Sequence, residues 1–395
     1  MIKKLAIALG IGAALHGGAW AQETIKIGVM DIDSGPYVTV SKYHVDGAKY
    51  MVDVLNAQGG ALGRKYELVV QSFQGTPATA VAAATKLVDQ GGALAILGMN
   101  FSSTSIAVAA KMPQMNALFI DNSSASSDLI GKYCNQNYFH VAVTDSMNLN
   151  GLRAQVKASG AKTWDLLSVD YSAGHDFAKG FATLVAESGG KIQSTLFAPL
   201  TTTDFGSYIS QMGAKPSEAL MVFFPGSGAI ALAKQQQQFG WFGKYKTVLT
   251  QFFTNDTLID AQGDTTAGLF TLQGYHSAWP GERNAAFVKA FESRFKYKPT
   301  YPAGDMVVGI EVLHQAILKA KSTDVAAVRA ALRGLKTQTI VGDVEMRAAD
   351  HQLLRPMGVA QAVKVSDGKG TIVLRSVEPT SRITPDVSPE CKMPS

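Results

Sequence analysis

Serine residues are concentrated in two short segments that each follow an apolar run and precede a sequence with helical spacing. Residues 99–105 read MNFSSTS and residues 121–128 read DNSSASSD. Serine hydroxyls and free backbone N–H groups at the start of a helix can bind a carboxylate, but serines in such positions also serve only as helix caps. The sequence leaves both interpretations open. The candidate anion-binding residues are Ser102, Ser103, Ser123 and Ser124.

Other segments that follow predicted strands contain aromatic side chains. These segments read DIDSGPY (31–37), DYSAG (170–174), PGSG (225–228) and QFFTN (251–255). Core packing explains many aromatic side chains, whereas rings in loops at an interface between domains suit a flat or apolar ligand. Both alternatives remain open here. The candidate ligand-binding residues are Tyr37, Phe101, Tyr171, Phe252 and Phe253, with Ser227 from the PGSG segment.

No catalytic or metal-binding pattern accompanies these segments in the sequence. It has no GxSxG motif and no P-loop, and its seven histidines form no HxH or HxxxH pair. Residues 226–231 fit GxGxxA, but the next predicted strand ends in Thr250 and Gln251 instead of the acidic residue that a dinucleotide site requires. We therefore expect no catalytic residues, no metal and no cofactor.

Alternating strand-like and helical segments are expected to position these loops. In the first half, residues 42–56 have apolar side chains at 45, 48, 51, 52 and 55, the spacing of one helix face. The predicted strands of this half are 24–30, 66–73, 93–97 and 117–120, and its predicted helices are 42–56, 78–88 and 104–112. This order predicts a parallel sheet with helices on both faces, and ligands bind such sheets beyond the carboxyl ends of the strands.

The same alternation restarts after residues 141–147. Its predicted strands are 164–169, 191–197, 219–224 and 247–250, and its predicted helices are 176–187, 204–212 and 229–239. The last third is predicted to contain helices at 284–295, 306–320 and 324–332, then strands at 337–346, 357–364 and 371–375. The predicted fold class is therefore α/β, with two doubly wound, Rossmann-like lobes and a ligand cleft between them.

The first residues indicate export. Lys3 and Lys4 precede an uncharged apolar run at 5–15, and Ala19-Trp20-Ala21 places small residues where a signal peptidase cleaves. We expect a signal peptide at 1–21, cleavage before Gln22 and a periplasmic location. A retained membrane anchor is the alternative, but the run is short for a spanning helix.

The remaining chain, about 374 residues, is longer than one hydrophobic core usually covers. The formal net charge of the full sequence, +5, is not gathered into a block of lysines and arginines, so we expect no nucleic-acid partner. In an oxidising compartment, we expect the two cysteines, Cys134 and Cys391, to form a disulfide, with two free thiols as the alternative. A disulfide would attach the C-terminal tail to the N-terminal half.

Several segments together resemble the periplasmic solute-binding proteins of ABC importers, of the type that binds branched-chain amino acids. The opening IKIGVMDIDSGPY, the stretch NAQGGALGRKYELVV and the segment ALAILGMNFSSTS are similar to that family, as are VDYSAGHDFAKGF and AGDMVVGIEVLHQAI. The resemblance covers residues 24–375, and the order of these motifs is more specific than any one of them.

The resemblance implies a type I periplasmic binding protein, whose two lobes are joined by three crossover strands. They fall here near 142–147, 273–278 and 346–356. Lobe 1 would comprise 22–143 and 275–348, lobe 2 would comprise 144–274 and 349–385, and 386–395 would form a C-terminal tail. In this family, the lobes close around the ligand.

The resemblance also assigns roles to the loop residues. It places the family's carboxylate-binding serine loops at Ser102, Ser103, Ser123 and Ser124. The chain departs from the pattern of amino-acid binders, because Phe252 stands where they have an acidic residue for the ammonium group and Ser227 stands near an expected aromatic residue. A buried ammonium without a counter-charge is costly.

These observations predict a monomeric binding protein that delivers a small carboxylate, aromatic or hydrophobic, to the permease subunits of an ABC importer. A soluble periplasmic sensor of the same fold and a binder of aliphatic amino acids are the alternatives. An exported hydrolase is a third, against which the missing nucleophile motif weighs.

Overall fold

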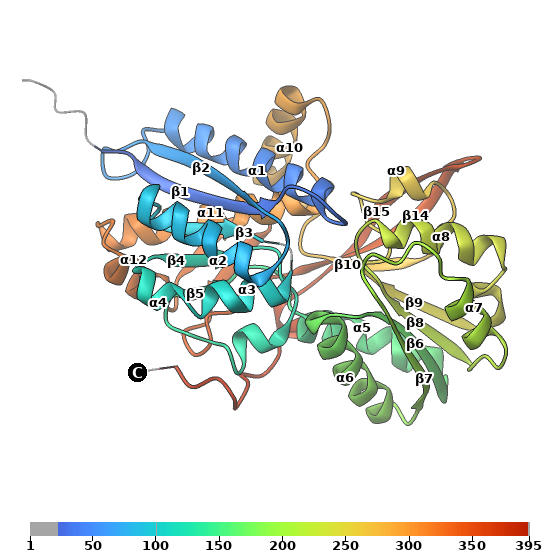
Figure 1. Ribbon diagram of the computed structural model, residues 1–395. Helices are drawn as coiled ribbons and strands as arrows, with labels where there is room; N and C mark the ends of the chain where they lie inside the picture. Colours follow the sequence, from blue (N-terminus) through green and yellow to red (C-terminus); the bar gives the residue numbers. More distant parts are fainter. Residues whose placement is uncertain (1–22, 100, 394–395) are drawn as a thin grey trace, which may run out of the picture.

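The computed structural model describes residues 23–99 and 101–393 and shows two α/β lobes (Figure 1). The predicted signal peptide and its cleavage position lie outside these ranges. None of the helices within them is long and apolar enough to cross a membrane.

The first lobe is built on a parallel sheet that is apolar on both faces. In strand β1 (Ile25–Ile32), Ile27 and Val29 belong to the hydrophobic core on one face, and Met30 and Ile32 belong to the core on the other, as expected from the alternation of side chains along a strand. The order of strands is β2 (Tyr66–Phe73), β1, β3 (Ala95–Gly98), β4 (Leu118–Asp121) and β5 (Tyr138–His140). The first face is covered by α1 (Val38–Ala57), α10 (Glu282–Phe295), α11 (Tyr301–Ala320) and α12 (Val325–Leu332), and the other by α2 (Pro77–Thr85), α3 (Ser102–Ala109) and α4 (Met112–Met115).

The second lobe has a similar parallel sheet and an added antiparallel one. The parallel strands have the order β7 (Lys191–Ala198), β6 (Thr163–Val169), β8 (Ala219–Phe223) and β9 (Thr247–Gln251). Its helices are α5 (Asp145–Ser159), α6 (Ser172–Glu187), α7 (Gly206–Gly213), α8 (Gly228–Gln238) and α9 (Ile259–Gln262). The antiparallel sheet consists of β10 (Phe270–Gln273), β14 (Met357–Ser366) and β15 (Lys369–Glu378). Two doubly wound units are therefore present, and the predicted fold class is confirmed.

The chain passes between the lobes three times, and the buried side chain of Arg355 joins the three passages. Its Nη1 donates to the carbonyl oxygen of Val141 at 3.1 Å, and its Nη2 donates to that of Gly274 at 2.6 Å. Nη2 also lies 2.8 Å from Oδ1 of Asp305 in α11. Arg355 is itself on the third passage, so one guanidinium fixes the crossovers relative to each other.

The third passage lies later than the predicted boundary at 349. Strand β13 (Leu353–Leu354) extends the hairpin of β11 (Lys336–Thr339) and β12 (Gly342–Met346). Leu353 is part of the first lobe's core, whereas Met357 is part of the second lobe's core. Residues 349–354 therefore pack with the first lobe.

Other differences from the prediction are three elements that were missed and one helix that begins earlier than expected. Helix α5 and the strands β5 and β10 were not predicted, because α5 is rich in polar residues and the two strands are only three and four residues long. Helix α11 begins at Tyr301 instead of 306, with Pro302 in its first turn, where the missing N–H of proline has no cost. This early start brings Tyr301 and Asp305 to the lobe interface.

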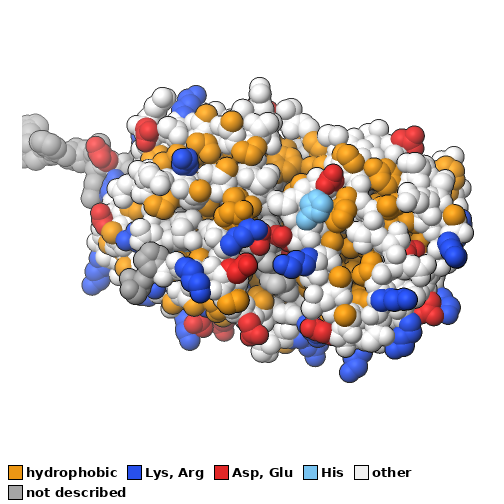
Figure 2. All heavy atoms as spheres, turned by 60° about the horizontal axis from the view of Figure 1, so that its bottom comes forward, with side chains coloured by type: hydrophobic (Ala, Val, Ile, Leu, Met, Phe, Trp, Pro, Cys, Tyr) orange, Lys and Arg blue, Asp and Glu red, His pale blue; other side chains and the backbone are white. Residues whose placement is uncertain are grey.

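Charges of both signs lie close together on the side of the molecule that Figure 2 turns forward. In the groove formed there by α5, α6 and the C-terminal segment, Arg153 pairs with Glu187, and Asp128 of this groove pairs with Lys132. Exposed pairs of this kind contribute little to stability. The lining of this groove contains more acidic side chains than basic ones, with Asp128, Asp145, Asp176, Glu187 and Asp386 against Arg153 and Lys179.

The predicted disulfide is confirmed. Cys134 and Cys391 are bonded, with their Cα atoms 5.5 Å apart, and the bond closes a loop of 257 residues. It attaches the end of the chain (388–393) to the segment between β4 and β5 of the first lobe.

Removing this bond should destabilise the first lobe. A disulfide that closes a long loop restricts the unfolded chain, so we expect Cys134→Ser/Cys391→Ser to lower the free energy of unfolding by about 2–5 kcal/mol. Urea titration of the variant and of the oxidised wild type would measure the difference, and the reduced wild type should match the variant. Equal unfolding free energies would contradict the prediction.

Candidate ligand-binding site

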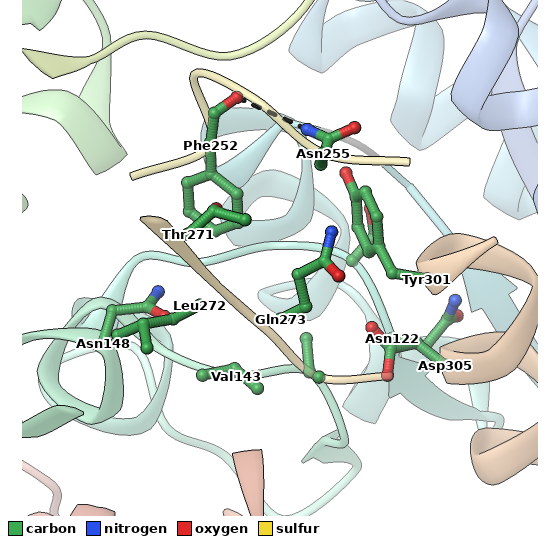
Figure 3. A pocket seen from close by; sticks show the side chains of 13 residues that line it. Asn122, Val143, Asn148, Phe252, Asn255, Thr271, Leu272, Gln273, Tyr301 and Asp305 are labelled. Carbon is green, nitrogen blue, oxygen red and sulfur yellow. Dashed lines mark hydrogen bonds between the residues drawn. The ribbon is translucent and has the colours of Figure 1, made fainter. Parts of the chain in front are cut away.

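A cavity lies between the lobes next to the crossovers (Figure 3). Part of the cavity is open to solvent. The first lobe contributes the loop after β4 and the start of α11. The second lobe contributes α5, the loop after β9 and strand β10. The lining residues used below are Asn122, Asn148, Phe252, Thr271, Gln273 and Asp305.

Four uncharged polar side chains of this lining are buried and have atoms without a hydrogen-bond partner in the protein. The atoms are Asn122 Nδ2, Asn148 Nδ2, Thr271 Oγ1, and both Nε2 and Oε1 of Gln273. The four residues are between 1% and 4% exposed. Because an unpaired buried polar group costs about 1–3 kcal/mol, their convergence on one cavity indicates a site for a polar ligand.

Two of these amides are held in a fixed orientation by their oxygen atoms. Asn122 Oδ1 accepts from the backbone N–H of Gly98 at 2.8 Å, and Asn148 Oδ1 accepts from Gln251 Nε2 at 3.1 Å. Each side chain therefore keeps its Nδ2 as the unpartnered group. N–H donors of this kind are suited to a carboxylate or to another acceptor.

Phe252 supplies an apolar wall, and its backbone conformation is unusual. Its φ of +58° lies in the left-handed region, which is rare for a large side chain and often marks a functional site. The ring packs edge-on against Phe223, with centroids 5.5 Å apart. Tyr301 adds a second ring to the lining.

Asp305 is the only acidic residue in the described lining, and it is already paired. Its Oδ1 lies 2.8 Å from Arg355 Nη2, and both side chains are buried. Burial raises the pKa of Asp305, and the neighbouring guanidinium opposes this rise. The carboxyl of Asp305 therefore pairs with the crossover residue Arg355 and is not available to a ligand.

A second acid, Asp256, connects the lobes beside the cavity. It follows β9 in the second lobe, and its Oδ2 accepts from the backbone N–H of Tyr301, the first residue of α11 in the first lobe, at 2.9 Å. Burial raises the pKa of this carboxyl to about 8. At neutral pH, Asp256 is mostly protonated, and it caps a helix that has no side-chain cap of its own.

The structure brings only part of the predicted site to this cavity. Ser123 and Phe252 line it. Ser102 and Ser124 are buried in the first lobe, where Ser102 Oγ accepts from the N–H of Ser126 at 3.2 Å and Ser124 Oγ lies 2.5 Å from Ser105 Oγ. Ser103 lies half-buried in the first turn of α3.

The backbone N–H groups proposed for anion binding are also engaged within the first lobe. Those of Ser123 and Ser124 both donate to Oδ1 of Asp121 at 3.0 Å. This carboxylate occupies the backbone donors of one of the two loops on which the expected anion site relied. The uncharged polar groups that remain unpartnered in the cavity come from amide side chains and from the hydroxyl of Thr271.

The remaining predicted aromatics meet at another point of the lobe interface. The hydroxyls of Tyr37 and Tyr171 are 3.3 Å apart, and the ring of Phe101 lies 5.1 Å from that of Tyr37 and 6.3 Å from that of Tyr171. Ser227 donates its N–H to the carbonyl of Pro36 at 3.2 Å. These residues join the lobes in a closed arrangement and are not part of the lining described above. Phe253 is in the second lobe's core.

Sequence reasoning missed Asn148, Thr271, Gln273, Tyr301 and Asp305. Asn148, Thr271 and Gln273 lie on α5 and β10, which were not predicted, and Tyr301 and Asp305 precede the predicted start of α11. Asn122 lies within the DNSSASSD segment, but only the serines of this segment were named as candidate binding residues. A buried amide has no distinctive sequence signal, so only its position beside an expected strand end pointed to it.

Comparison with known proteins identifies the family. The model of the periplasmic binding protein family matches residues 24–369. The chain belongs to the periplasmic binding protein family. This chain is 22% identical to a curated relative, a Leu/Ile/Val-binding protein homologue of Brucella melitensis, and the match covers 92% of this chain and 91% of that protein. The resemblance stated from the sequence is thus confirmed.

Solved structures share the fold at low identity. A solute-binding protein of an ABC transporter from Rhodopseudomonas palustris, in complex with 3,4-dihydroxybenzoic acid, has a TM-score of 0.81 at 20% identity and covers 90% of this chain and 98% of its own. A leucine-, isoleucine-, valine-, threonine- and alanine-binding protein from Brucella ovis, in a closed conformation, has a TM-score of 0.82 at 19% identity and covers 94% and 100%. The fold therefore serves ligands with and without an amino group.

The pKa of Asp256 predicts how stability depends on pH. The folded protein holds this proton up to about pH 8, whereas the unfolded chain releases it near pH 4, so the contribution of Asp256 to stability falls between these values and is constant above them. Asp256→Asn can still accept from the N–H of Tyr301 but does not titrate. We therefore expect its stability relative to wild type to rise from pH 4 to pH 8 and then to level off.

Melting temperatures of both proteins across this pH range would test the prediction. Burial also raises the pKa values of Asp145, Asp305 and Glu311, but these groups are common to both proteins and cancel in the difference. A difference that does not change with pH would contradict the assignment.

Proposed function

We propose that this protein is the periplasmic component of an ABC importer and that it captures a small aromatic or hydrophobic carboxylate between its lobes. It would be exported by cleavage before Gln22, act as a monomer and deliver its ligand to membrane permease subunits, without catalysis of its own. The observation that carries the proposal is the set of unpartnered amide N–H groups in a cavity whose acidic side chain is already paired.

The donors of the cavity favour a carboxylate. A buried carboxylate needs several N–H groups to replace its water, and it does not need a cation if these are present. Asn122, Asn148 and Gln273 each supply an unpartnered N–H group. The Arg355–Asp305 pair nearby adds no net charge when both groups are ionised, so it does not repel the ligand.

The charges of the cavity disfavour an α-ammonium group. Asp305 is bound to Arg355, and the carboxyl of Asp256 caps α11 and is mostly protonated at neutral pH. The resemblance noted from the sequence also implies that Phe252 stands where amino-acid binders of this family have an acid. An ammonium group would therefore lack a counter-charge, which costs several kcal/mol in a buried site.

The apolar walls and the relatives agree with an aromatic body. Phe252 and Tyr301 offer two ring faces or edges to a flat ligand. Solute-binding proteins from Rhodopseudomonas palustris with the same fold have been solved with benzoate and with 4-hydroxybenzoate. The Brucella ovis protein supports the alternative of an amino acid, which a direct comparison of ligands decides.

Isothermal titration with benzoate, hydroxybenzoates, leucine and an aliphatic acid would test this proposal. We expect at least one aromatic acid to bind and leucine to bind at least 10-fold more weakly. In a thermal-shift measurement, a ligand at 100 times its dissociation constant stabilises the protein by about 2.7 kcal/mol. Tight binding of leucine without binding of any aromatic acid would refute the proposal.

A further inference from the structure

Strand β10 presents two polar side chains to the cavity. Thr271 and Gln273 are two positions apart, so they project from the same face of the strand, and both line the cavity. Leu272 between them also lines the cavity and is part of the second lobe's core. The exposed fractions of Thr271 and Gln273 are 1% and 4%. Strand β10 thus places two enclosed polar groups beside a mostly apolar wall.

Neither side chain has used its hydrogen-bonding groups elsewhere. Thr271 Oγ1 has no partner in the protein, and Gln273 has none at either Nε2 or Oε1. Exchanging the two amide atoms of Gln273 leaves one donor and one acceptor unpartnered in either orientation. In this, Gln273 differs from Asn122 and Asn148, whose oxygens are already bonded.

This combination fits a ligand group that both donates and accepts. A carboxylate accepts hydrogen bonds only, so it would satisfy Gln273 Nε2 and leave Oε1 unpaired. A hydroxyl can donate to Oε1 and accept from Nε2 or from Thr271 Oγ1. On an aromatic carboxylate, the group with these properties is a phenolic hydroxyl.

The position of Gln273 agrees with a group attached to a ring. Its side chain rises from β10 into the space that Phe252 and Tyr301 also line (Figure 3). Asn122 lines the same cavity from the loop after β4, in the first lobe. One ring can therefore bring its carboxylate to Asn122 and its hydroxyl to β10.

We propose that Gln273 and Thr271 bind a hydroxyl group on the ring, so that this protein selects hydroxylated aromatic carboxylates over unsubstituted ones. The inference rests on the proposed function and narrows its ligand class. A site built to bond a hydroxyl rejects the analogue without it, because its own polar groups then remain buried and unpaired. The expected preference is about 10- to 100-fold in dissociation constant.

Isothermal titration of the wild type with benzoate, 3-hydroxybenzoate, 4-hydroxybenzoate and leucine is the first test. We expect one hydroxybenzoate to bind at least 10-fold more tightly than benzoate. Benzoate that binds as tightly as both hydroxybenzoates would overturn this inference and leave the proposed function standing. Binding of leucine alone would instead refute the proposed function.

Variants assign the preference to these residues. Gln273→Leu should bind benzoate and the preferred hydroxybenzoate with similar affinity, within about threefold, and Thr271→Val, which keeps the shape of the side chain, should reduce the preference. The control is Gln361→Leu on the neighbouring strand β14, because Gln361 bonds Gly268 and Arg375 and does not line the cavity. It should keep the wild-type preference.

Two outcomes of the variants would contradict the assignment. Retention of the full preference in both Gln273→Leu and Thr271→Val would show that the hydroxyl binds elsewhere. Loss of all benzoate binding in a folded Gln273→Leu protein would show that Gln273 holds the carboxylate. Circular dichroism of each variant checks folding, and the ligand comparison on the wild type decides the inference even if a variant does not fold.

Discussion

The arrangement of the two lobes depends on the contacts that the guanidinium of Arg355 makes. It bonds the backbone of the first crossover at Val141, the backbone of the second at Gly274, and Asp305 at the start of α11, while Arg355 itself lies on the third crossover. Removing either Arg355 or Asp305 would be strongly destabilising, because the charge of the remaining side chain would be buried without a partner. The Arg355–Asp305 pair therefore holds the three crossovers together. It also engages the only acidic side chain of the described cavity lining, so this carboxylate is not available to a ligand.

The pairing of Asp305 with Arg355 determines which polar groups the cavity offers to a ligand. With Asp305 engaged and Asp256 capping α11 across the interface, the polar groups left for a ligand are neutral amides and a hydroxyl. Phe252, held in a left-handed backbone conformation, contributes an aromatic ring to the lining. A cavity with these properties favours an anionic or neutral ligand that brings its own apolar body, and it disfavours a cation.

The two doubly wound sheets could be predicted because their central strands are mostly apolar and lie between helices with clear spacing. The loops after β4 and β9 were correctly expected to matter, and Ser123 and Phe252 do line the cavity. The sequence could not show that Asp121 and Ser105 satisfy the groups of Ser124, or that Tyr37, Phe101 and Tyr171 contact each other across the interface. Gln273 was not recognised because β10 has only four residues and pairs with β14, which is distant in the sequence.

A crystal structure of the protein with 4-hydroxybenzoate tests the central claim most directly. The account predicts the ligand between Phe252 and Tyr301, with its polar atoms within about 3.2 Å of amide nitrogens of Asn122, Asn148 or Gln273. A ligand bound instead among Tyr37, Phe101 and Tyr171, with these three amides still unpartnered, would contradict it.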